Sequence, residues 1–324
     1  MVVDRILEQW RSLTLYFQHR IIDHKDLIAR AIYNALKNPI FKMYLSFLSY
    51  VLKLISKLNL NLQSEQPKVP EMLDNLTTFY KCLLNCFIKK TVIKEKKLNE
   101  IVPNNPNNFL PLEELYLGAK VDVIEKDPNL NIPPTELHNF KLRCLDFLIK
   151  VSIQIRRRFN FEDPHLMFAS NFIPNKIING SKRSITEWYH LFPYLKLDLE
   201  TVNTEWQIMC EMANSFNESD VTSFWRQIVK TKNELAQPMF PNLMVIVKIV
   251  LCLPHLSAAA ERVFSSLNSI KNRVRNRLKI STCNSILHVK QSVYFAKSVP
   301  KWELKYFKGQ NLINDTEVDD VSNL

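Results

Sequence analysis

The chain has 324 residues, a formal net charge of +11 and only three glycines. A chain of this length can bury a sizeable core as one large domain or two ordinary ones. Phosphate loops of the Gly-x-Gly kind are excluded, because they need glycine where the backbone takes a positive φ or approaches a ligand closely. The positive charge favours polyanionic partners, nucleic acid first, although a generally lysine-rich composition explains it equally well.

Apolar residues spaced three and four apart predict helices along most of the chain. The first helix contains Ile6 and Phe17, and a longer one starts at Asn38-Pro39, where proline suits the first helical position. The elements expected after it are a helix over 71–90, a loop over 99–108, a short helix over 110–118 closed by Gly118, and a linker over 127–134.

The second half of the chain continues the helical pattern. We expect a helix through Cys144 and Phe159 that ends in Arg156-Arg157-Arg158, short helices and turns over 160–200, and further helices over 199–215, 221–231, 240–252, 257–267 and 282–297. No segment alternates with the period of two that marks a half-buried strand, so the predicted fold class is all-α. A break near 217–221 predicts a domain over 1–220 and a second over 221–298, followed by a disordered acidic tail over 308–324.

The six cysteines form no Cys-x-x-Cys pair, and no histidine lies at zinc-ligand spacing from any of them. Their scatter indicates a reduced, intracellular protein. We expect no signal peptide. The longest apolar run, Leu243–Leu253, is too short to span a bilayer and includes Lys248, so no membrane contact is expected.

Glu261 is the first candidate for chemistry. A carboxylate can hold Mg²⁺ or act as a general base, but it can also be an exposed helix acid beside Arg262. A two-metal site needs more than one acid, and no Asp lies between Asp220 and Asp315.

A basic series follows Glu261. Its members alternate along the chain, and they are Lys271, Arg273, Arg275, Arg277 and Lys279. In an extended segment they would face one way and contact a phosphate backbone. The alternative is a solvated basic turn between two helices.

One stretch of the sequence resembles a known family. The motifs are Phe240-Pro241, Leu253-Pro254, the run Ala-Ala-Ala-Glu-Arg-Val-Phe-Ser over 258–265, and Arg-Asn-Arg-Leu over 275–278. Together with Trp225 they resemble the C-terminal dimerisation region of hAT-superfamily transposases over about 225–290. The earlier segments are similar to the helical domain inserted into that family's RNase H-like fold. Ala260 is a departure, because the family more often has Ser there.

The resemblance carries expectations about the site. In that family two Asp and one Glu hold divalent metal, and the Glu corresponds to Glu261. The two Asp lie on strands ahead of the inserted domain, and we expect this sequence to lack those strands. The implied fold is a helical insertion domain followed by the C-terminal helices of an RNase H-like transposase. Mg²⁺ or Mn²⁺ would bind only if the missing Asp were supplied, so no cofactor and no DNA strand cleavage are expected.

The expected function is therefore dimerisation, with a homodimer or a related hAT-derived protein as partner. We expect a nuclear protein without a small-molecule substrate. The predicted interface and core positions are Trp225, Leu243, Ile246, Val250, Phe264, Leu278 and Leu287. The alternatives are nucleic-acid binding through 271–279, with DNA as partner, or a fragment of an active transposase.

Overall fold

The computed structural model describes residues 2–24, 26–63, 68–180, 182–216, 220–253, 258–272 and 275–298. Throughout these residues the regular elements are helices, so the all-α prediction is confirmed. Two isolated β-bridges, Ile88 with Phe109 and Lys232 with Pro238, occur in the same residues without building a strand. The chain forms two compact units, Met1–His255 and Leu256–Leu324.

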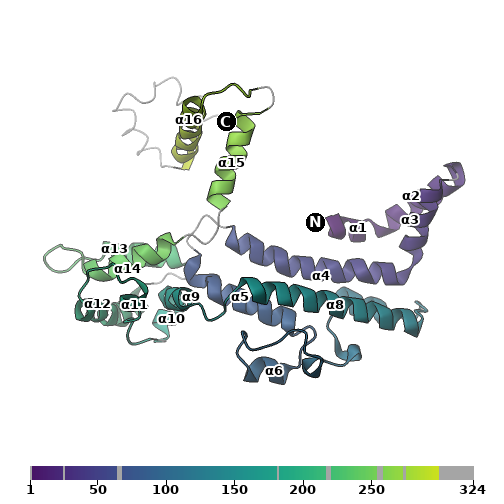
Figure 1. Cartoon of the computed structure of the whole chain (residues 1–324), viewed down its shortest axis with the longest axis horizontal. Coiled ribbons are helices and arrows are strands. Elements are labelled where there is room, and N and C mark those ends of the chain that lie inside the picture. The colour runs from purple at the N-terminus through teal and green to yellow at the C-terminus, as the bar shows by residue number, and fades with distance from the viewer. Residues whose placement is uncertain are drawn as a thin grey trace. The chain divides into compact units, whose positions relative to one another are not determined.

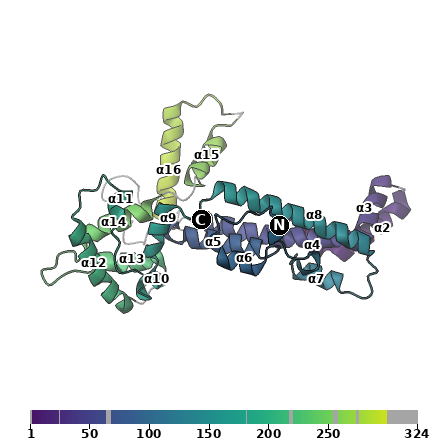
Figure 2. The ribbon, with the colours of Figure 1, turned by 60° about the horizontal axis from the view of Figure 1, so that its bottom comes forward.

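The two longest helices of the first unit lie in its N-terminal part. The helices of this part are α1 Val2–Glu8, α2 Trp10–His24, α3 Leu27–Lys37, α4 Pro39–Leu62, α5 Val69–Leu84, α6 Lys90–Glu95, α7 Ala119–Glu125 and α8 Pro134–Arg158; α7 is labelled in Figure 2 and the others in Figure 1. Two short 3-10 turns, Pro106–Asn108 and Leu112–Glu114, lie between α6 and α7. Helices α4, α5 and α8 lie side by side in both ribbon views (Figures 1 and 2). Their shared core buries Met43, Val51, Tyr80 and Leu148.

The start of α4 follows the sequence signal. Asn38 is its N-cap, and its side-chain oxygen accepts a hydrogen bond from the Ile40 amide at 2.8 Å. Pro39 takes the first helical position, where its missing N–H leaves no helix hydrogen bond unmade. The predicted beginning of this helix is confirmed.

Gly118 has a different role from the one predicted. The helix expected over 110–118 is wrong, because only Leu112–Glu114 forms a 3-10 turn there, and Gly118 precedes α7 instead of closing a helix. Its φ is +104°, and a Cβ at this position would lie 2.9 Å from Cβ of Tyr50. Glycine is needed here both for the backbone conformation and for the close approach to Tyr50.

Short helices and turns fill 160–200, as expected. The remaining elements of the first unit are α9 Pro164–Ala169, a 3-10 turn Ser170–Phe172, α10 Pro174–Ile178, α11 Trp188–Leu191, α12 Leu199–Met212, a 3-10 turn Ala213–Ser215, α13 Val221–Lys230 and α14 Pro241–Cys252. Their core is rich in aromatic rings. The ring centroid of Phe172 lies 5.6 Å from that of Trp206 and 5.7 Å from that of Trp225.

This aromatic core crosses the domain boundary expected at residue 220. Trp206 belongs to α12 and Trp225 to α13, and both are buried in the same hydrophobic cluster. The two compact units divide instead after His255. The boundary differs because Phe172 packs against indole rings from both sides of the expected break.

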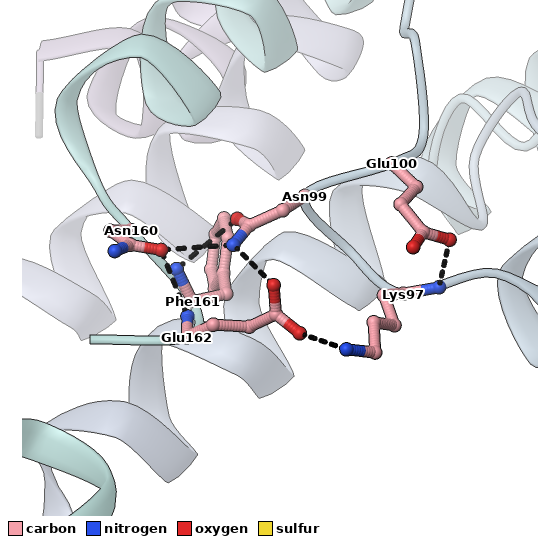
Figure 3. Close-up of polar contacts among 6 residues, drawn as sticks. All are labelled: Lys97, Asn99, Glu100, Asn160, Phe161 and Glu162. Carbon is pink, nitrogen blue, oxygen red and sulfur yellow. Dashed lines mark hydrogen bonds and ion pairs between the residues drawn. The ribbon is translucent and has the colours of Figure 1, made fainter. Parts of the chain in front are cut away.

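A polar cluster joins the loop after α6 to the segment after α8 (Figure 3). The side-chain nitrogen of Asn99 donates to Asn160 Oδ1 at 2.9 Å and to Glu162 Oε2 at 3.2 Å. The side-chain oxygen of Asn99 accepts from the backbone amide of Phe161 at 3.3 Å. Lys97 forms an ion pair with Glu162 at 2.7 Å. Hydrogen bonds from Lys97 and Asn99 hold the pKa of the Glu162 carboxyl below its ordinary value.

The second unit contains α15 Ala258–Ile270 and α16 Ile280–Ser298, two helices that contact each other. The helices expected over 257–267 and 282–297 are confirmed. The acidic tail expected over 308–324 lies outside the described residues. None of the described helices is long and apolar enough to cross a membrane.

Candidate dimerisation surface

Helix α14 is the most apolar helix of the predicted interface, and the first unit already covers most of it. Leu243, Ile246 and Val250 are buried in the aromatic core. The face left to solvent is narrow and contains Val245 and Lys248. The three predicted positions on α14 therefore stabilise the fold of the first unit, because a second subunit cannot contact side chains that are already buried.

Trp225 is buried in the same way. Its indole nitrogen donates to the Phe172 carbonyl at 2.9 Å, and only 2% of the residue is exposed. A buried indole N–H that finds an acceptor contributes packing without leaving an unpaired donor. Trp225 is thus a core residue that supports α13 and not a contact residue.

Glu205 positions the start of α14, and sequence reasoning missed it. Its Oε2 accepts from the Leu243 amide at 2.7 Å, while Oε1 accepts from the Asn242 amide at 3.3 Å and from the Asn242 side chain at 2.8 Å. The carboxylate lies on α12 and is almost fully buried. A negative charge at this place also complements the positive end of the helix dipole.

The sequence contains one indirect indication of Glu205, which is that α14 has no local N-cap side chain. Phe240, the residue before α14, has no side chain that can accept a hydrogen bond from the first turn. The amides of a buried first turn must find an acceptor somewhere. The missing local cap implied a remote one, but its identity depends on how α12 packs.

The second unit has the opposite character. Among its described side chains, Ile270 and Cys283 are the buried hydrophobic ones. Leu278 and Leu287 are half-buried. Four large apolar side chains are exposed in the same two helices: Phe264 at 62%, Val263 at 38%, Ile280 at 77% and Val289 at 62%. Phe264 is the one predicted interface residue that is fully available at the surface.

Glu261 lies in the first turn of α15 and is exposed. An acid in this turn suits the helix dipole, which accounts for its position without any chemistry. Within the described part of the chain, no three His, Cys, Asp or Glu residues gather in a way that could hold a metal ion.

The basic series lies between α15 and α16. Arg275 and Arg277 are in a turn, where the Arg275 amide donates to the Asn272 side chain at 2.9 Å and to its carbonyl at 3.0 Å. Lys271, Arg275, Arg277 and Lys279 are exposed, and Arg273 lies outside the described residues. Residues Arg275–Arg277 therefore form the solvated turn, and not the extended segment in which the basic side chains would face one way.

The comparison with protein families matches residues 196–293 to the hAT family C-terminal dimerisation region. The match includes the motifs over 225–290 and begins ahead of α12. Neither the curated proteins nor the solved structures gave a match. Both the buried helices α12–α14 and the exposed hairpin α15–α16 thus fall in a segment related to the C-terminal dimerisation region of hAT-family proteins.

Proposed function

We propose that the chain self-associates through its second unit, with the hairpin α15–α16 as the contact surface of a homodimer. The observation that carries the proposal is the exposed apolar set of Val263, Phe264, Ile280 and Val289 in a hairpin whose described side chains bury only two hydrophobic residues, Ile270 and Cys283. Two isolated helices are marginally stable in water without an apolar partner surface. The family match to a dimerisation region supports the same assignment.

Phe264 is the side chain with which to test this proposal. Burial of an exposed phenyl ring is worth roughly 1–2 kcal/mol here, and the dimer contains two copies. Replacement by serine should therefore raise the Kd of the dimer by roughly 30- to 700-fold. Light scattering on the full chain over a range of concentrations measures this change.

The control is Val123→Ser, because Val123 is 70% exposed on α7, outside the matched segment. At each concentration, the molar mass that light scattering gives for this variant should equal that of the unaltered chain. A monomer at every concentration, or a Phe264→Ser variant that dimerises as well as the unaltered chain, would contradict the proposal.

The second part of the proposal is that the chain alone does not cut DNA. Glu261 is the one acid that the resemblance assigns to the metal site, and a single carboxylate cannot hold two divalent ions. A nicking assay with Mg²⁺ or Mn²⁺ on supercoiled DNA is expected to give intact substrate. Cleavage that is lost in Glu261→Gln would overturn this part.

Nucleic-acid binding through the basic turn is the second candidate function. Lys279 stands directly before α16, where a positive charge is unfavourable beside the positive end of the helix dipole. Arg275, Asn276, Arg277 and Leu278 line a hollow at the same place. A bound phosphate would relieve the repulsion among these cations.

Binding to duplex DNA should then weaken steeply with salt, because each neutralised phosphate releases counterions. The double variant Arg275→Glu with Arg277→Glu should abolish binding, whereas Lys120→Glu, an exposed cation on α7, should have little effect. Equal affinity of the double variant and the unaltered chain would remove this function.

A further inference from the structure

An apolar groove runs between α4 and α8 in the first unit, far along the chain from the matched segment. Phe79 of α5 also lines it, and its volume is about 510 Å³, within the range of ordinary binding sites. Its apolar lining residues are Ile55, Leu58, Leu62, Phe79, Phe147, Val151, Ile155 and Phe159. Leu58 and Phe79 are buried, and the others are only partly covered.

Helices α4 and α8 run in the same direction, since two aromatic pairs along them follow the same order in both helices. Tyr44 packs on Phe140 with ring centroids 4.8 Å apart, and Phe47 packs on Phe147 at 5.7 Å. Beyond these pairs each helix continues its apolar stripe toward its C-terminus. Ile55, Leu58 and Leu62 on α4 have the i, i+3, i+7 spacing of one helix face, so the stripe is a surface that a third helix can fill.

The dimensions of the groove fit a short helix. The lining residues on α4 span 55–62 and those on α8 span 147–158, which correspond to roughly 10 and 16 Å of helix axis. That length holds about two to three helical turns. Amphipathic helices bind in grooves of this kind through apolar anchors at i, i+3 or i+4, and i+7.

The polar residues of the groove set the charge of its partner. Among the described residues that line it, the polar ones are Asn59, Lys150, Gln154 and Arg158, which are two amides and two cations without a carboxylate. Lys150 forms an exposed ion pair with Asp146 at 2.6 Å, whereas Arg158 is an exposed cation at the end of α8. An acidic ligand therefore fits better than a basic one.

The same charge argues against a second copy of this chain as the occupant. Helix α3 also has an apolar face in solvent, with Leu27 at 78% and Ile28 at 72% exposed. That helix carries Arg30 and Lys37, which have the same sign as Lys150 and Arg158. Juxtaposed like charges would oppose its entry into the groove.

We propose that the groove between α4 and α8 binds an acidic amphipathic helix of a partner protein. The apolar anchors of that helix lie on Ile55, Val151 and Ile155, and its carboxylates face Arg158. The interaction is independent of the hairpin α15–α16.

The experiment uses two displayed peptide libraries selected on the full chain. Both contain helical peptides of about 12 residues with Leu, Ile, Met or Phe at the anchor positions, and they differ only in Glu and Asp against Lys and Arg at the flanks. The acidic library should yield binders and the basic library none. Affinities of the selected peptides are then measured against the full chain and its variants.

Ile155→Asp should abolish peptide binding, because it places a charge on the apolar wall. Arg158→Glu should weaken binding at least about tenfold, and since Arg158 is exposed this variant keeps its fold. Arg143→Glu, an exposed cation on the same helix outside the groove, is the matched control and should bind normally.

Four results would overturn the proposal. The acidic library yields no binder, or the basic library does equally well, or the selected peptides bind Arg158→Glu as tightly as the unaltered chain. A fall in the mass of the chain on Ile155→Asp, with retained helix content, would instead assign the groove to a second copy and reject the partner helix.

Discussion

The matched segment contains two regions that both carry large apolar side chains and that differ in what surrounds them. Helix α14 buries Leu243, Ile246 and Val250 against α12 and the aromatic core. The hairpin α15–α16 leaves Phe264 and Ile280 in solvent. Apolar content alone therefore does not identify an interface, because the neighbours of a helix decide whether its face is core or surface.

The largest expected change in unfolding free energy comes from a substitution in the buried region. Trp225→Ala removes a buried indole and its hydrogen bond to Phe172, which should cost about 3–5 kcal/mol of unfolding free energy. Phe264→Ala, measured in urea on dilute protein, should change that free energy by less than about 0.5 kcal/mol. Equal losses in the two variants would erase the distinction between core and surface.

A smaller effect is expected at the remote cap. Glu205→Ala leaves the buried amide of Leu243 and the partly buried amide of Asn242 without their acceptor, at a cost of about 1–3 kcal/mol. Glu211→Ala, on the same helix but exposed, is the matched control and should be nearly neutral. Urea denaturation followed by far-UV circular dichroism compares the two; an unchanged midpoint for Glu205→Ala would show that solvent replaces the cap.

The smallest effect concerns acid pH. The pKa of Glu162 is lowered in the folded state by Lys97 and Asn99, so its contribution to stability is present above the ordinary glutamate pKa and is lost as pH falls through the lowered value. Glu162→Gln should therefore flatten the loss of stability on the acid side of about pH 4.5. The control is Glu136→Gln, which replaces an exposed glutamate at the start of α8 outside this cluster. Parallel acid titrations of the two variants would contradict the assignment.

The acid dependence of stability should also differ between the first unit and the hairpin α15–α16. The hairpin contains one carboxylate, Glu261, over residues 258–298, whereas the Glu162 cluster and the lowered pKa values of Asp4 and Asp198 all belong to the first unit. We expect helix signal from the first unit to be the part that responds to mild acid.

Much of the fold was predictable from local signals. The Asn38-Pro39 start of α4 and the arginine-rich end of α8 both depend on residues within one helical turn. The start of α3 carried the same kind of signal, since Asp26 caps it through the Ile28 and Ala29 amides, but that helix was not identified. Its apolar residues Ile28, Ala29, Ile32 and Leu36 recur at the spacing of one helix face, so the pattern was available in the sequence as well.

Features that depend on distant packing could not be predicted in the same way. Gly118 suggested the end of a helix, and its actual role follows from Tyr50, 68 positions earlier in the chain. The assignment of Trp225, Leu243, Ile246 and Val250 to an interface or to a core likewise required their neighbours. Phe264 was predicted as an interface residue from the resemblance, and its exposed ring is available for contact with a second subunit.

The remote cap has a consequence for the inheritance of this segment. Glu205 and the α14 amides that it holds lie 37 and 38 positions apart, on either side of the domain boundary that the sequence suggests near 217–221. Recombination at that break would give a descendant α14 without its acceptor and would expose the aromatic core as well. Natural fusions that carry this dimerisation region should therefore retain α12 with it, and their boundaries should fall before Leu199.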